Sequence, residues 1–178
     1  PWLEADSWTA EELARARAYL AVSYAGRRRF RTAGQALERA AAMAAIAGAD
    51  AQRLVEYVRL SILIYEGRWE EGIQSLNTYI AAHPDEHRAY ILLATCCEHL
   101  GEADAVLRTL RAACDRFPEH PELHIRLSTA AWAAGQTVLA QDALDRAGAL
   151  LTGRRAERIV RHMRAMLHEP GRRLPVPP

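Results

Sequence analysis

The sequence predicts an all-α fold in which antiparallel helix pairs stack into a solenoid. Three observations support this prediction. First, the 178 residues are rich in good helix formers, with 35 alanines, 23 arginines and no lysine. Second, glycine and β-branched residues are scarce, which argues against a β-sandwich or a barrel. Third, small and apolar residues recur every 34 positions through the middle of the chain.

The 34-residue repeat consists of five columns of residues. The columns are Gly67, Gly101 and Gly135; Pro84 and Pro118; Leu76, Leu110 and Leu144; Gly72, Val106 and Ala140; and Tyr79, Ala113 and Ala147. The last two columns lie four residues before and three residues after the leucines, so all three share one helix face. The glycines lie where a helix must end and the chain reverse, and the prolines end the following helix. Each unit is therefore a helix, a turn and an antiparallel helix, and stacked units bury a common core.

These columns resemble the tetratricopeptide repeat family, which has the same period and a similar order of aromatic, leucine, small and proline positions. The clearest copy runs through Tyr90, Leu93, Ala94, Cys97, Gly101, Val106, Leu110, Ala113 and Pro118. An earlier copy runs through Leu20, Ala21, Tyr24, Phe30, Ala33, Leu37 and Ala40. The resemblance covers residues 14–152 and implies a right-handed α-solenoid.

Two places depart from the repeat. Phe30 and Trp69 are 39 residues apart, one period plus five, so we expect a lengthened loop near residues 47–50. Arg59 stands where a core leucine is expected, and Leu60 where a small residue is expected. We therefore expect this helix to be rotated relative to its neighbours.

The ends of the repeat array define the predicted domains. Residues 1–9 form a lead-in, 10–152 four helix pairs, 153–169 a C-terminal capping helix, and 170–178 a proline-rich tail or linker. Thr9 and Glu12 form a capping-box pattern, so a helix should start near Ala10. The chain begins with Pro1 rather than Met, and we expect it to be a piece of a longer protein.

Composition and motifs exclude several function classes. A net charge of +1 provides no field that would attract nucleic acid or a membrane, and no apolar run is long enough for a membrane span. We predict a cytoplasmic protein in which the adjacent Cys96 and Cys97, like the third cysteine, are reduced packing residues.

Histidines provide the strongest candidate for chemistry. His83 and His87 are four residues apart, as are His120 and His124, and such pairs on a helix can ligate zinc. A proline follows the first histidine of each pair, which places both pairs across a helix start. No glycine-rich phosphate loop or nucleophile motif is present. We predict no enzyme activity, no catalytic residue, no cofactor and no metal site.

The resemblance implies a binding groove, because first helices of such repeats line a concave face where partner peptides commonly bind. The predicted groove residues are Leu54, Tyr57, Ser61, Tyr65, Arg88, Ile91, Thr95, Glu98, Glu122, Ile125, Thr129 and Trp132. The first copy would add Arg15, Ala18, Tyr19 and Val22. These side chains suit an extended or helical apolar peptide. The alternative is that Tyr57 and Trp132 only pack between repeats.

A second candidate surface lies near the C-terminus. Residues 153–173 hold seven arginines against two glutamates, a net charge of +5. We predict either a solvated helix face or a patch for an anionic partner, formed by Arg154, Arg155, Arg158, Arg161 and Arg164. No aromatic residues are interleaved, which argues against a nucleic-acid partner.

Our first functional hypothesis is a protein–protein interaction module that binds a partner peptide or protein segment in the groove, as a chaperone or assembly scaffold. The alternative is an intramolecular regulatory or sensor domain of a larger enzyme or transcription regulator, which contacts flanking domains of its own chain. A third hypothesis is an adaptor that binds anions through the arginines.

Overall fold

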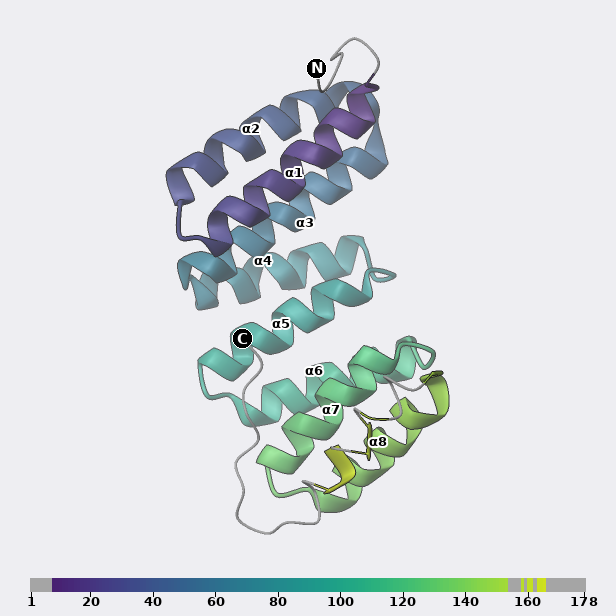
Figure 1. Cartoon of the computed structure of the whole chain (residues 1–178). Coiled ribbons are helices and arrows are strands. Elements are labelled where there is room, and N and C mark those ends of the chain that lie inside the picture. Colours follow the sequence, from purple (N-terminus) through teal and green to yellow (C-terminus); the bar gives the residue numbers. More distant parts are fainter. Residues whose placement is uncertain (1–7, 154–157, 159, 162, 166–178) are drawn as a thin grey trace. The chain divides into compact units, whose positions relative to one another are not determined.

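The computed structural model describes residues 8–153, 158, 160, 161 and 163–165. This part of the chain forms helices and turns without strands (Figure 1). Its helices are α1 (Ala10–Gly26), α2 (Phe30–Ala47), α3 (Ala49–Glu66), α4 (Trp69–Ala82), α5 (His87–His99), α6 (Ala103–Arg116), α7 (Pro121–Ala133) and α8 (Thr137–Leu150). The predicted all-α fold of helix pairs is confirmed. No helix in the described residues is long and apolar enough to cross a membrane.

The chain divides into two compact units, residues 1–79 and 80–178. In the first unit, α1, α2 and α3 all contact one another. The buried faces of α1 and α2 are mostly alanine, whereas α3 contributes the larger Val55, Val58 and Ile62 to the same core. Because alanine has a short side chain, the backbones of α1 and α2 can approach closely.

In the second unit, α5 packs on α6, α6 on α7, and α7 on α8. The leucine column is central to this core, since Leu110 and Leu144 are fully buried. Ser128 Oγ on α7 donates a hydrogen bond to the carbonyl oxygen of Ala140 on α8, at 2.8 Å. A small residue at each of these positions lets the two helices meet at hydrogen-bond distance. The leucine column and the two columns that flank it are therefore core positions, whereas the glycines and prolines of the repeat are exposed.

Three turns repeat with the same geometry at the glycine column. Gly67, Gly101 and Gly135 have φ of 77°, 74° and 73°, the left-handed region that favours glycine. In each turn the residue after the glycine donates its backbone N–H to a carbonyl five residues earlier, as Arg68 does to Leu63 at 3.0 Å. This pattern satisfies the carbonyls at the end of the first helix and reverses the chain.

The capping box at the start of α1 forms as predicted. The backbone N–H of Glu12 donates to Thr9 Oγ1 at 3.2 Å, and the backbone N–H of Thr9 donates to Glu12 Oε2 at 2.8 Å. The hydrogen bonds from Thr9 lower the pKa of the Glu12 carboxyl. The first helix therefore begins at Ala10.

The predicted lengthened loop near residues 47–50 is wrong. Only Gly48 separates α2 from α3, and the extra residues lengthen the helices, which have 18 residues each. The local sequence is rich in alanine and lacks proline, so continuing the helix is more favourable than opening a loop. In α3, Arg59 is exposed and Leu60 is buried. Leu20, at the leucine position of the first copy, is also 50% exposed.

Candidate functional site

The predicted groove residues of the first unit lie on α3 and are unequally accessible. Leu54 packs against the core of α1, α2 and α3. Ser61 is buried, and its Oγ donates to the carbonyl oxygen of Tyr57 at 3.1 Å. Tyr57 is half-buried, while Tyr65 is 49% exposed. Leu54 and Ser61 therefore serve packing, and the two tyrosines are the side chains a partner could reach.

The residues that the first copy would add lie on α1 and differ in accessibility. Ala18 is fully buried in the core, so its assignment to the groove is wrong. Arg15 forms an ion pair with Glu11 at 2.6 Å, and Tyr19 is exposed. The error follows from placing a whole helix face in the groove when half of it packs against α2 and α3.

In the second unit, a direct hydrogen bond joins α5 and α7, the first helices of two neighbouring helix pairs. Arg126 Nη1 on α7 donates to Thr95 Oγ1 on α5 at 3.3 Å. Thr95 Oγ1 in turn donates to the carbonyl oxygen of Ile91 at 2.9 Å, and Thr129 Oγ1 donates to that of Ile125 at 3.0 Å. The facing sides of α5 and α7 therefore form one surface. We name it the α5–α7 strip, made of Arg88, Ile91, Thr95, Glu98, Glu122, Ile125, Arg126, Thr129 and Trp132.

The α5–α7 strip combines exposed charges with half-buried apolar side chains. Arg88, Glu98 and Glu122 are exposed, and Ile125 and Trp132 are half-buried. Ile91 is only 8% exposed and belongs mainly to the packing of α5. The accessible apolar area of the strip therefore lies on α7.

Glu98 is electrostatically coupled to the neighbouring helix of the strip. Desolvation raises the pKa of its carboxyl, an effect that Arg126 on α7 and His99 partly offset. The Glu98 side chain is nevertheless exposed to solvent. Glu98 and Arg126 therefore bring opposite charges to the same part of the α5–α7 strip.

Arg126 was not among the residues predicted from the sequence. The repeat register assigned its neighbour Ile125 to the groove. Arg126 follows Glu122 by four residues and precedes Thr129 by three, so these residues share a helix face. That spacing was the signal available in the sequence.

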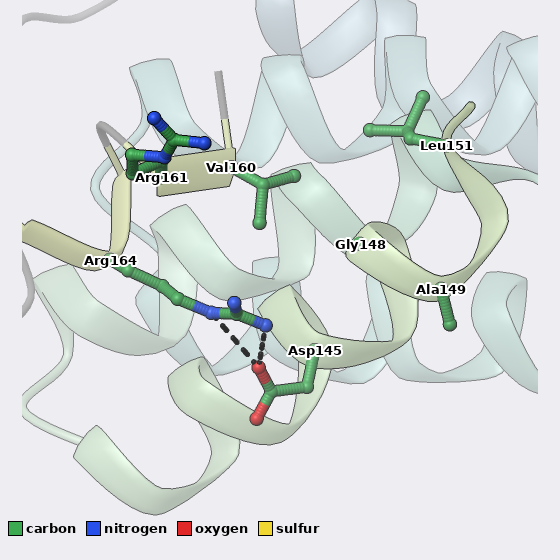
Figure 2. Close-up of a pocket in the computed structure, with 7 residues that line it drawn as sticks. All are labelled: Asp145, Gly148, Ala149, Leu151, Val160, Arg161 and Arg164. Atoms are coloured by element: carbon green, nitrogen blue, oxygen red, sulfur yellow. Dashed lines mark hydrogen bonds and ion pairs between the residues drawn. The ribbon is translucent and has the colours of Figure 1, made fainter. Parts of the chain in front are cut away.

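The predicted anion patch is only partly within the described residues. Arg154 and Arg155 lie outside them, while Arg158, Arg161 and Arg164 are helical and exposed. Figure 2 shows Arg164 reaching Asp145 on α8, whereas the Arg161 side chain lies apart from this pair. Arg164 Nε donates to Asp145 Oδ1 at 3.1 Å, and Nη2 contacts the same oxygen. The anion patch therefore stays a prediction. The positive charge of Arg164 is already balanced by the Asp145 carboxylate.

Asp145 anchors this segment to α8. Hydrogen bonds from Gln141 and then from Arg164 lower the pKa of the Asp145 carboxyl, so it is ionised at neutral pH. Val160 is buried against Gly148, where an added Cβ would lie 3.3 Å from Val160 Cγ1. An open cavity of about 520 Å³ remains beside this contact, lined by Asp145, Gly148, Ala149, Leu151, Val160, Arg161 and Arg164 (Figure 2).

The cysteines of the second unit are packing residues. All three are buried, and desolvation raises the pKa of Cys96 and of Cys114 to about 11. Thiols with such values are protonated at neutral pH and are weak nucleophiles. Among the described residues, no cluster of three or more His, Cys, Asp or Glu side chains could hold a metal ion.

Comparison with known proteins agrees with this architecture. Residues 87–130 match the family described as tetratricopeptide repeat, which confirms the resemblance. The matched residues span α5, α6 and most of α7, the helices that carry the α5–α7 strip. The chain has no match among curated proteins.

Solved structures share the fold at low sequence identity. PilF of Pseudomonas aeruginosa has a TM-score of 0.61 at 16% identity, over 86% of this chain and 72% of PilF. MamA from residue 41 to its end, from Desulfovibrio magneticus RS-1, has a TM-score of 0.58 at 15% identity, over 77% and 75% of the two chains. MamA from AMB-1 has a TM-score of 0.54 at 21% identity, over 87% of each chain.

Proposed function

We propose that this chain, whose fold is that of tetratricopeptide repeats, is a protein-interaction module that binds a partner segment on the α5–α7 strip. The observation that carries the proposal is the hydrogen bond between Arg126 and Thr95, which links two neighbouring first helices, α7 and α5, into one surface. Members of this family commonly bind protein segments on their first helices. The proposal assigns the chain no catalytic step.

The hydrogen-bonding state of the strip indicates what a partner must offer. Thr95 and Thr129 both donate their hydroxyl hydrogens to their own helices, so each hydroxyl can only accept from a partner, and Thr95 Oγ1 already accepts one hydrogen bond from Arg126. Glu98 and Glu122 add carboxylate acceptors. We therefore expect the partner segment to supply donors, such as backbone N–H groups or a lysine or arginine.

The apolar part of the strip is small and lies on α7. Ile125 and Trp132 are half-buried and seven residues apart, which is two helical turns. Aromatic side chains that are already partly packed lose little conformational freedom when they bind. We expect one or two apolar side chains of the partner to dock here, flanked by its donor groups.

Site-specific photo-crosslinking tests the proposal. Benzoylphenylalanine at Thr129 reports on the strip, and the same group at Ala112, exposed on α6, is the matched control. Each labelled chain is irradiated in an extract of its native host, and the crosslinked proteins are identified by mass spectrometry. Glu98→Arg is added to the Thr129-labelled chain, because an exposed charge can be reversed without disturbing the core.

The expected result is one crosslinked protein at Thr129 that is absent at Ala112 and lost with Glu98→Arg. Circular dichroism must show equal helicity for every variant. Crosslinking that is equal at Thr129 and Ala112 would refute the strip as the binding surface. A crosslink from Thr129 to another segment of the same parent chain would favour the intramolecular regulatory function instead.

A further inference from the structure

Histidine and phenylalanine side chains cluster where α5 begins and where α6 joins α7. The rings of His87, the first residue of α5, and His120, the N-cap of α7, are stacked with centroids 4.0 Å apart and planes 25° apart. Phe117 contacts both rings edge-on, with centroids 6.0 Å from His87 and 5.9 Å from His120. We name the pair of His87 and His120 the histidine stack.

The histidine stack joins the same two helices as the hydrogen bond between Arg126 and Thr95. It lies at their N-terminal ends, and the hydrogen bond lies about two turns further along each helix. The stack is therefore a second lateral contact between α5 and α7.

Whether two imidazole rings can stack depends on the protonation state of each ring. Two neutral rings, or one neutral and one charged ring, can stack, but two positive rings at this distance repel each other. Histidine is the side chain that ordinarily changes charge between about pH 5 and 8. The geometry of the histidine stack therefore disfavours a positive charge on both rings.

Charged groups from several elements act on the stack. On the α5 side, Glu86 raises the pKa of His87 and Arg88 lowers it, while Glu122 on α7 raises it. These effects are smaller than desolvation and the charge of His120, which together hold the pKa of His87 below its ordinary value.

On α6, Arg116 lies over the Phe117 ring, 6.0 Å from its centroid, and its Nε donates to the carbonyl oxygen of Pro84 at 2.5 Å. Tyr90 of α5 also contacts this ring, with centroids 5.7 Å apart. The titratable residues His83 and Asp85 lie in the connection between α4 and α5. Arg116 therefore ties this connection to α6 through Pro84.

A third histidine, His124, lies on α7 close to the same turn. Its Nε2 donates to the carbonyl oxygen of Pro118 at 2.9 Å, because a carbonyl only accepts. Nδ1 of the same ring is buried and has no hydrogen-bond partner among the described residues. His124 therefore holds the turn between α6 and α7 against α7.

We propose that the histidine stack is a pH-sensitive contact between α5 and α7 that is closed near neutral pH and opens when both rings become protonated. Because the neutral form of His87 is favoured in the folded chain, this contribution to stability is present above about pH 6.5 and is lost as the pH falls. Acid would thereby separate the N-terminal ends of the two helices. This device depends only on the geometry of the second unit and not on a bound partner.

NMR titration and hydrogen exchange of the whole chain test the proposal. The imidazole Cε1–H resonances give the protonation of each ring between about pH 7.5 and 5.5. His120→Phe keeps an aromatic ring but removes its charge, and His99→Gln removes an exposed histidine at the other end of α5. In His120→Phe, His87 should take up its proton at higher pH than in the native chain. In His99→Gln it should behave as in the native chain.

Amide exchange in the first turns of α5 and α7 should increase on acidification beyond the intrinsic pH dependence, in the native chain and not in His120→Phe. Identical titration of His87 in the native chain and in His120→Phe would overturn the proposal, as would exchange that stays unchanged in acid. Should His120→Phe fail to fold, the native chain still decides. Amide exchange in the first turns of its α5 and α7 must increase as His87 takes up its proton, and exchange that stays unchanged would refute the proposal.

Discussion

Replacing Leu144 with alanine should remove a central part of the α7–α8 interface. Leu144 is fully buried on α8, in the leucine column of the repeat. The substitution removes three carbon atoms from a site with no access to water. The lost burial and the cavity left behind both lower the free energy of unfolding.

Both effects together should cost about 3 kcal/mol, as expected for leucine to alanine at a fully buried site. For a chain of this length the midpoint of thermal unfolding should fall by about 6 to 12 °C. The matched control is Leu20→Ala, the same chemical change on α1 at a side chain that is 50% exposed. That control should cost less than about 1 kcal/mol, because much less apolar area returns to water.

Urea unfolding followed by circular dichroism measures both free energies, and hydrogen exchange locates the loss. Exchange should accelerate in α7 and α8 of Leu144→Ala and stay unchanged in α1 and α2, because repeats depend mainly on their neighbours. Equal destabilisation by the two substitutions would refute the assignment of the leucine column to the core.

Three further predictions follow from local structure. Thr9→Ala should cost about 1 kcal/mol, because the capping box is lost, and an unchanged thermal midpoint would contradict its role. Gly101→Ala should lower the free energy of unfolding by about 1 to 2 kcal/mol, because φ is +74° there. Gly34→Ala inside α2, with open space around the new Cβ, should raise it by about 1 kcal/mol. Denaturant titration must therefore give changes of opposite sign in the free energy of unfolding for the two substitutions. Cys96 and Cys114, with pKa values raised to about 11, should react with a thiol reagent much more slowly than in the unfolded chain, and equal rates would show that water reaches them.

The repeat pattern predicted the core well because it reflects local chemistry. Leu110, Leu144 and Ala140 are buried where the columns placed them, and the glycines turn the chain in the left-handed region. The binding surface was predicted less well. Ala18 and Ile91 were assigned to the groove by register, yet both are buried, because the register does not say which half of a helix face a neighbouring helix covers.

The sequence by itself determined the helix pairs, their turns and the columns that form the core. These features depend on spacing along one helix and on residues with restricted backbone angles. Only the tertiary structure decided that Arg126 bonds Thr95, that His87 stacks on His120, and that Arg164 pairs with Asp145. These partners come from different helical segments, and their meeting depends on the distance and rotation between those segments. Side-chain packing sets both quantities, and no periodic pattern in the chain specifies them.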